Sequence, residues 1–194
     1  MSFPVVCGEE VPGYSWIPVN GGQKRLTNAN LANAIDWFGT IAAAYLKKQK
    51  TEDPFIVVPV PNSGCVASSS VKPQTRKLAK AVCDSLKDGS YVVDCLRWKK
   101  NLGSASKEGG PRDAGILYRN AVILEDQLKG IDKGLDVLLV DDVTTSGGHL
   151  RACVAKLQSK QLDTKIVVCG GKTIYDQANP AFHLYQDKLE NYHP

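Results

Sequence analysis

Three short stretches of the chain are almost wholly apolar, and polar or turn-forming residues follow each of them. They lie at 54–61, 137–140 and 165–169. A strand with one face in water alternates apolar and polar residues, so uninterrupted stretches indicate strands that are covered on both faces. Segments with apolar residues at helical spacing lie at 27–48, 74–87 and 150–157. The pattern predicts an α/β fold with a doubly wound, mainly parallel β-sheet and helices on both faces.

Weaker patterns fill the rest of the chain. We predict strands at Tyr91–Leu96 and Ala121–Leu124, and a loop without periodicity at Lys99–Gly115. The first twenty-six residues are rich in glycine and proline and are interpreted as a loose hairpin or covering segment. A length of 194 residues fits one domain, which we assign to 1–194.

Composition excludes several classes of protein. The net charge of +4 is modest, and the lysines and arginines form no dense stripe, so nucleic acid is not an expected partner. No stretch approaches the roughly 20 apolar residues of a membrane span. The N-terminus has neither a basic start nor a long apolar run, so we expect no signal peptide and a soluble, cytoplasmic protein.

Cysteine could signal a metal site or disulfides, and the chain has six. They are Cys7, Cys65, Cys83, Cys95, Cys153 and Cys169. No two of them form a C-x-x-C pair, and the histidines and cysteines form no recognisable zinc-binding spacing. We therefore favour reduced thiols in a reducing cytosol over a zinc site or disulfides.

The most informative segment is D-V-L-L-V-D-D-V-T-T-S-G-G-H-L, residues 136–150. Ligands of open parallel sheets bind beyond the carboxyl ends of strands, where Asp141 and Asp142 fall. Two adjacent carboxylates repel each other, so hydroxyl groups or cations are expected partners. Three hydroxyl residues and a glycine follow before a helix, at 144–147, and they suit a phosphate monoester. The combination predicts a sugar phosphate as ligand.

Simpler interpretations of the same segment exist. Asp142 and Thr144 could merely cap the following helix, although two acids, three hydroxyls and two glycines exceed what a cap needs. A P-loop nucleotide hydrolase would need an earlier glycine at Ile166, inside a predicted strand, so we reject that alternative. His149, in the first turn of the helix, is either a partly exposed helix residue or a ligand contact.

The segment V-L-L-V-D-D-V-T-T-S-G resembles the 5-phosphoribosyl-1-pyrophosphate (PRPP) signature of type I phosphoribosyltransferases. The resemblance implies the fold of that family, with a core at about 54–173 and a small hood from the chain ends, 1–53 and 174–194. It also implies that Asp141 and Asp142 hold the ribose hydroxyls. The residues implied to wrap the 5′-phosphate are Val143, Thr144, Thr145, Ser146 and Gly147.

Further features resemble the ComF-like branch of the family, without its cysteine-rich zinc module, because Cys7 stands alone. The implied pyrophosphate loop is Pro61, Asn62, Ser63 and Gly64, and an ordinary strand-to-helix turn is the alternative. Arg97 matches the arginine at a strand end. The implied mobile loop carries Lys99, Lys100, Lys107, Arg112 and Arg119, with Asn120 next to it, and a solvated basic loop is the alternative.

The resemblance implies a Mg²⁺-dependent transfer of the phosphoribosyl group to a nitrogenous base, with Asp141, Asp142 and Arg97 as catalytic residues. Magnesium would be held through PRPP and water near the two acids, rather than directly by side chains. A regulatory PRPP-sensing module, or a PRPP-consuming effector of a defence or toxin system, remains an alternative. The acceptor base is unidentified, and a homodimer is one open alternative for the oligomeric state.

Overall fold

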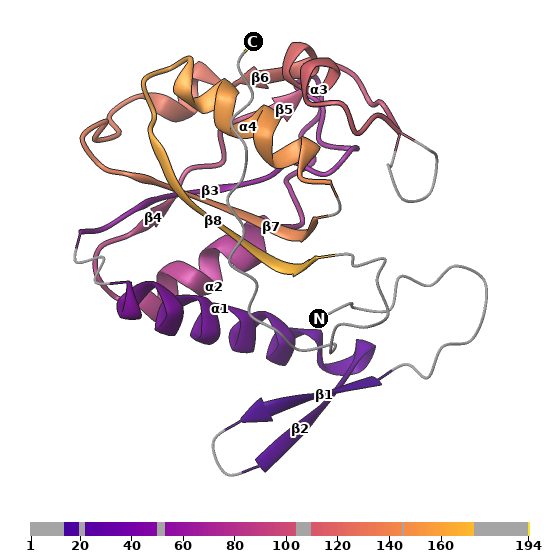
Figure 1. Ribbon diagram of the computed structural model, residues 1–194, viewed down its shortest axis with the longest axis vertical. Coiled ribbons are helices and arrows are strands. Elements are labelled where there is room, and N and C mark those ends of the chain that lie inside the picture. Colours follow the sequence, from indigo (N-terminus) through magenta and orange to yellow (C-terminus); the bar gives the residue numbers. More distant parts are fainter. Residues whose placement is uncertain (1–13, 20–21, 50–52, 104–109, 145, 173–193) are drawn as a thin grey trace.

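The computed structural model describes residues 14–19, 22–49, 53–103, 110–144, 146–172 and 194 (Figure 1). The helices are α1 (Leu31–Lys48), α2 (Arg76–Leu86), α3 (Ala114–Asn120) and α4 (Gly148–Gln158), with 3-10 turns η1 (Asn28–Asn30) and η2 (Glu125–Leu128). The strands are β1 (Tyr14–Val19), β2 (Gly22–Thr27), β3 (Ile56–Pro59), β4 (Tyr91–Val92), β5 (Leu96–Trp98), β6 (Ala121–Ile123), β7 (Val137–Thr144) and β8 (Thr164–Lys172).

A four-stranded parallel sheet forms the centre of the molecule. Its strand order is β4-β3-β7-β8, and every pairing within it is parallel (Figure 1). The four residues of β3 and the first four of β7 are completely or almost completely buried, as their uninterrupted apolar sequences predict.

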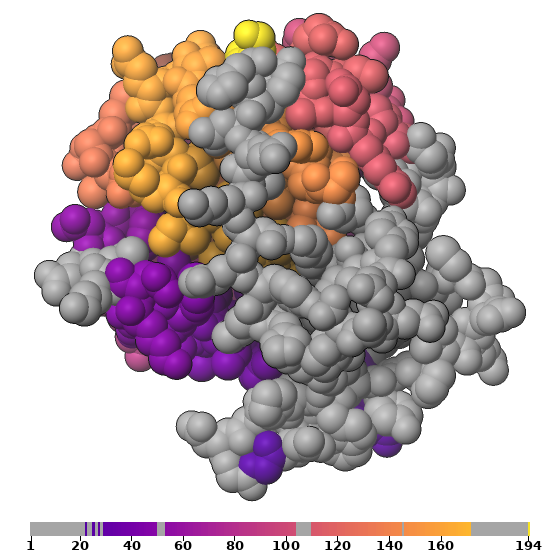
Figure 2. Space-filling view, viewed as in Figure 1, coloured from indigo at the N-terminus to yellow at the C-terminus, as the bar shows by residue number. Residues whose placement is uncertain are grey.

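Helices cover both faces of this sheet. Side chains of α1 and α2 pack with Val57, Leu138 and Val140 on one face. Side chains of α4, together with β5 and β6, pack with Val58 and Leu139 on the other (Figure 1). In the space-filling view the orange residues of α4 and β8 lie above the purple residues of α1, and α3 adjoins α4 (Figure 2). The predicted α/β class, with a mainly parallel sheet between helical layers, is confirmed.

The edge of the fold differs from the sequence prediction in one strand. The predicted strand at Tyr91–Leu96 is wrong in its extent, because β4 ends at Val92 and a separate strand, β5, begins at Leu96. β5 leaves the main sheet and pairs antiparallel with β6. The break coincides with Asp94, whose buried carboxylate binds the Arg97 side chain. An ion pair between residues three apart turns the chain out of a regular strand.

A short helix, α3, lies where we predicted the end of a loop. Asp113 caps it by accepting a hydrogen bond from the backbone N–H of Ile116, at 2.8 Å. β6 then follows at the predicted place. The predicted N-terminal hairpin is present as the antiparallel pair β1 and β2. Residues 1–13 and 173–193 lie outside the described residues, so the hood stays a prediction.

Within the described residues, no helix combines the length and apolar character that crossing a membrane requires. The cysteines that the structure describes are free thiols, and they are Cys65, Cys83, Cys95, Cys153 and Cys169. Burial raises the pKa of Cys83 and of Cys95 to about 12, so both stay protonated and unreactive at neutral pH.

Candidate functional site

Two connections that carry predicted site residues leave neighbouring strands at the same edge of the sheet. β3 and β7 pair in parallel, and the backbone N–H of Val60 donates to the carbonyl of Val140 at 2.9 Å. The next residues on the two strands are Pro61 and Asp141. The structure therefore brings the start of the predicted pyrophosphate loop beside the predicted ribose-binding acids.

The acid pair, Asp141 and Asp142, lies within β7 rather than after it. β7 runs on to Thr144, and Val143 and Thr144 align with Gly171 and Lys172 of β8. The predicted strand end at Val140 is therefore four residues short. Because successive strand residues point to opposite faces, Asp141 is buried, with 7% of its surface exposed, whereas Asp142 is exposed.

Each carboxylate of the acid pair accepts a hydrogen bond from the backbone N–H group of the next residue. Asp141 Oδ1 accepts from the N–H of Asp142 at 2.9 Å, and Asp142 Oδ1 accepts from the N–H of Val143 at 2.7 Å. No ion pair neutralises either acid within the part of the chain that the structure describes. Burial, and then the adjacent Asp142 carboxylate, raise the pKa of Asp141 well above its usual range. The pair therefore has no counter-charge among the described residues, and a hydroxyl-bearing or cationic ligand would stabilise it.

A short connection joins β7 to the N-terminus of α4. Thr145 lies outside the described residues, Ser146 is exposed, and Gly147 is the N-cap of α4. Gly147 has a φ of +74°, in the left-handed region that glycine adopts at little cost. The N–H groups of the first helical turn lack partners within the helix and carry the positive end of its dipole. This end of α4 can therefore accept an anion, as the sequence predicts.

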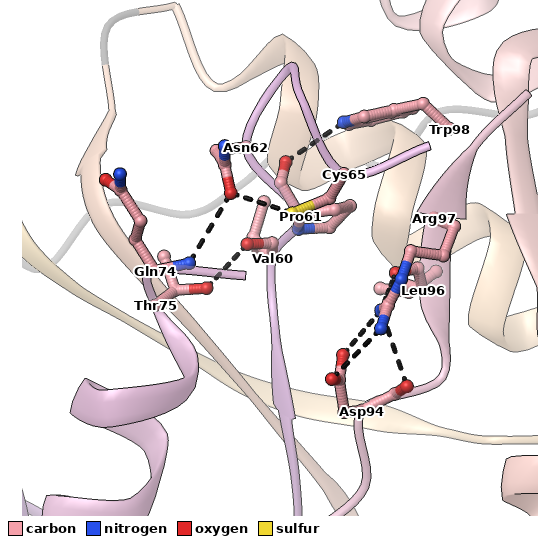
Figure 3. A network of polar contacts seen from close by, with 10 residues as sticks. All are labelled: Val60, Pro61, Asn62, Cys65, Gln74, Thr75, Asp94, Leu96, Arg97 and Trp98. Atoms are coloured by element: carbon pink, nitrogen blue, oxygen red, sulfur yellow. Dashed lines mark hydrogen bonds and ion pairs between the residues drawn. The ribbon is translucent and has the colours of Figure 1, made fainter. Parts of the chain in front are cut away.

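The predicted pyrophosphate loop, Pro61–Gly64, forms a hydrogen-bonded turn (Figure 3). The backbone N–H of Cys65 donates to the carbonyl of Asn62 at 2.9 Å. The Asn62 side-chain oxygen accepts from the Cys65 thiol at 2.9 Å and from the N–H of Gln74 at 3.4 Å. Ser63 and Gly64, at the tip, are half-exposed. The turn is thus held in one shape by its own polar groups, with its tip open to solvent.

Neighbouring elements fix the stem of this turn as well. The Thr75 hydroxyl donates to the carbonyl of Val60 at 2.6 Å, at the start of α2. The Trp98 indole N–H donates to the carbonyl of Pro61 at 3.0 Å (Figure 3). Thr75 and Trp98 are both buried, so the bonds lie where water does not compete for them.

Arg97, a predicted catalytic residue, lies in the middle of β5 with 7% of its surface exposed. Its guanidinium donates to both carboxylate oxygens of Asp94, at 2.6 and 3.1 Å, and to the carbonyl of Leu96 at 2.7 Å (Figure 3). These contacts give Arg97 a structural role in shaping β5. A catalytic role for it stays a prediction.

The residues of the predicted mobile loop are only partly described. Lys99 and Lys100 are exposed, and Asn120 holds their backbone through bonds to the Lys99 N–H (2.7 Å), the Lys100 N–H (3.1 Å) and the Lys100 carbonyl (2.9 Å). Arg119 is exposed in the last turn of α3. Lys107 lies outside the described residues.

At Arg112, after the undescribed part of the predicted mobile loop, the chain again lies beside the site. A Cβ added to Gly148, the first residue of α4, would lie 2.0 Å from the carbonyl oxygen of Arg112. The backbone at Arg112 therefore passes directly against the N-terminus of α4. This places one described end of the predicted mobile loop beside the predicted phosphate-binding segment.

Two residues near the site had no settled role in the sequence analysis. Trp98 was not singled out, and His149 was left between a helix residue and a ligand contact. Their rings meet edge to face, with centroids 5.6 Å apart and planes at 74°. Burial lowers the pKa of His149, and the Asp142 carboxylate partly opposes that shift. No local sequence signal indicates this contact, because it joins β5 to α4.

No protein-family model matches the chain, and no curated protein matches it. Among solved structures, the chain is similar to a hypoxanthine phosphoribosyltransferase from Staphylococcus aureus, at 14% identity over 74% of this chain and 75% of that chain, with a TM-score of 0.46. It is also similar to the hypoxanthine phosphoribosyltransferase from Trypanosoma cruzi in complex with the product IMP, at 16% identity over 83% and 72% of the chains, with a TM-score of 0.40. Sequence identities and TM-scores this low do not identify an activity for the chain.

Proposed function

We propose that the chain is a Mg²⁺-dependent phosphoribosyltransferase, which binds PRPP and transfers its phosphoribosyl group to a nitrogenous base or similar acceptor. The observation that carries the proposal is the acid pair of β7, which has no counter-charge among the described residues and leads within a few residues to the N-terminus of α4. The motif over 137–147, with its resemblance to the PRPP signature, adds the ligand class. The ComF-like branch stays a prediction, and the acceptor base is unidentified.

Each part of PRPP has a matching element at this edge of the sheet. Ribose hydroxyls that donate to Asp141 and Asp142 would relieve the repulsion between the two acids. The 5′-phosphate would lie at the N-terminus of α4, where the helix dipole favours an anion. The diphosphate would lie at the half-exposed tip of the Pro61–Gly64 turn, next to the acid pair.

Magnesium fits the donor set at this site. Carboxylate oxygens are hard ligands, and magnesium typically takes only one or two of them together with substrate phosphates and water. Asp142, the exposed member of the acid pair, would face the ion, and the buried Asp141 is its neighbour in β7. When bound, the ion would neutralise charge on the diphosphate.

In the proposed reaction the bond between C1′ and the pyrophosphate oxygen breaks, and pyrophosphate leaves with the electron pair. A bond from C1′ to the acceptor nitrogen forms, and that nitrogen releases its proton. The transition state requires little covalent work from side chains, so catalysis would depend on positioning and on neutralising the leaving group. Lys99, Lys100 and Arg112 are exposed cations on the segments that adjoin the site.

The test is an assay of pyrophosphate release from PRPP in MgCl₂, with and without a mixture of purine and pyrimidine bases. We expect release that depends on a base and stops when EDTA removes magnesium. Tight PRPP binding without release would favour a regulatory sensor, and release without any base would favour a PRPP-consuming effector. The absence of both binding and release would contradict the proposal.

A further inference from the structure

Trp98 contacts the Pro61–Gly64 turn through hydrogen bonds. Its indole N–H donates to the carbonyl of Pro61, its backbone N–H donates to the carbonyl of Cys65 at 2.9 Å, and its carbonyl accepts from the N–H of Ala67 at 2.8 Å. These three bonds reach residues at both ends of the turn, and Figure 3 shows the one to Pro61. The position of the turn therefore depends on the position of Trp98.

The Trp98 ring also contacts the element that follows the acid pair. The ring lies edge to face with His149, the second residue of α4. α4 follows the acid pair along the chain, after residues 145–147. A series of contacts thus runs from Pro61 through Trp98 to His149, at the start of α4.

This series is rigid because its central member is buried. Trp98 has 2% of its surface exposed and belongs to the core cluster that also contains Leu150 and Cys153 of α4. Close-packed interiors transmit displacements, so a shift of the indole would move the turn relative to α4. An indole held by both a hydrogen bond and packing has one preferred orientation.

We infer that Trp98 and His149 are positioning residues that set the distance between the Pro61–Gly64 turn and the acid pair. The inference rests on the proposed function, because it takes the turn and the acid pair as two subsites for one ligand. A ligand with a sugar phosphate at one end and a diphosphate at the other has a fixed span. Its two parts bind together only when the two subsites are correctly spaced, and a displacement of about 1 Å can cost up to a hundredfold in rate.

The test compares a linked ligand with its separate parts. Trp98→Phe keeps an aromatic ring in the core and removes the indole N–H that binds Pro61. Calorimetry in MgCl₂ would measure the affinities of PRPP, of ribose 5-phosphate and of inorganic pyrophosphate. We expect the variant to bind PRPP at least about tenfold more weakly than the wild-type chain, and each separate part within about threefold, because only the linked ligand senses the spacing. Trp37→Phe, in α1 across the sheet, is the matched control and should bind all three as the wild-type chain does.

His149→Gln provides an independent variant, which carries the test if Trp98→Phe does not fold. It should show the same pattern, with PRPP affected more than its parts. Equal losses for PRPP and both parts would indicate a merely structural role and would overturn the inference. Unchanged PRPP affinity in both variants would overturn it as well. A wild-type chain that binds none of the three ligands would instead contradict the proposed function.

Discussion

The connections after β3 and β7 start side by side, yet the polar groups around them differ in how far other residues of the chain bind them. After β3, residues 60–75 form a long connection whose polar groups bond to one another and to Trp98. After β7, only residues 145–147 separate the strand from α4, and the acid pair is left without a counter-charge among the described residues. The first connection stabilises the fold, whereas the acid pair, just before the second connection, carries charge that no described residue compensates. Such uncompensated groups are where a ligand gains most.

The largest effect should come from the exposed member of the acid pair. Asp142→Asn keeps the side-chain shape and an oxygen for the Val143 N–H but removes the negative charge. We expect PRPP turnover to fall on the order of 10³-fold, since the charge acts at the reacting sugar. Circular dichroism melting should show an intact fold. A well-folded variant that retained its turnover would contradict a functional role for the acid pair, and the two connections would then not differ in function.

A large loss of stability should follow from breaking the buried ion pair beside the first connection. Asp94→Ala would leave the Arg97 guanidinium buried without its partner, at a cost of about 3–5 kcal/mol in the free energy of unfolding. Urea denaturation measures this loss. Lys80→Ala, which breaks the exposed pair between Lys80 and Asp84, is the control and should cost at most about 0.5 kcal/mol. Similar losses in the two variants would contradict the structural role of Arg97.

Two glycine substitutions, one in the connection after β3 and one at the start of α4, should have unequal effects. Gly148→Ala places a methyl group against the Arg112 carbonyl and should destabilise the chain by about 1–3 kcal/mol. Gly64→Ala meets its nearest atom, Asn62 Nδ2, at 3.6 Å, and its φ is not in the left-handed region, so its stability should change by about 0.5 kcal/mol or less. Thermal melting of both variants gives the comparison. If Gly148→Ala were harmless, the close approach of Arg112 to α4 would be absent in solution.

The smallest effect concerns the buried acid and depends on pH. The pKa of Asp141 is higher in the folded chain than in the unfolded one, mainly because of burial. Below about pH 3 both states are protonated and the group contributes nothing. As the pH rises further, the unfolded chain loses its proton first, so the group destabilises the fold increasingly until the pH passes its folded-state pKa.

Asp141→Asn removes this titration and keeps an acceptor for the Asp142 N–H. Its free energy of unfolding should exceed that of the wild-type chain by roughly 1 kcal/mol at pH 7 and equal it at about pH 3. Urea denaturation at several pH values measures both. A lower stability at pH 7, or a difference that does not depend on pH, would show that Asp141 is paired in the folded chain.

The sequence predicted the central sheet because buried strands are written as uninterrupted apolar residues, as in Val137–Val140 and Ile56–Pro59. It also placed the acid pair near the carboxyl end of this strand, although β7 extends past both acids to Thr144. It missed α3, which is only seven residues long and follows a segment rich in glycine and lysine. The Asp113 cap was its one local signal.

Other features could not be predicted because they depend on residues that meet only in the folded chain. The Asp94–Arg97 pair divides the predicted strand at 91–96, although each residue alone suits a surface position. The Trp98–His149 contact joins β5 to α4, on the face of the sheet that α4 covers. The burial of Asp141 beside an exposed Asp142 follows from strand alternation, but only once β7 is known to extend past Val140.

The most direct test of the acid pair as a sugar site is a calorimetric comparison of ribose 5-phosphate with 2-deoxyribose 5-phosphate in MgCl₂. The two ligands share the phosphate and differ in one hydroxyl group of the diol. We predict that the chain binds ribose 5-phosphate at least about tenfold more tightly, which is the worth of one hydrogen bond to a charged group. Equal affinities for the two sugars would contradict the assignment of Asp141 and Asp142 to the ribose hydroxyls.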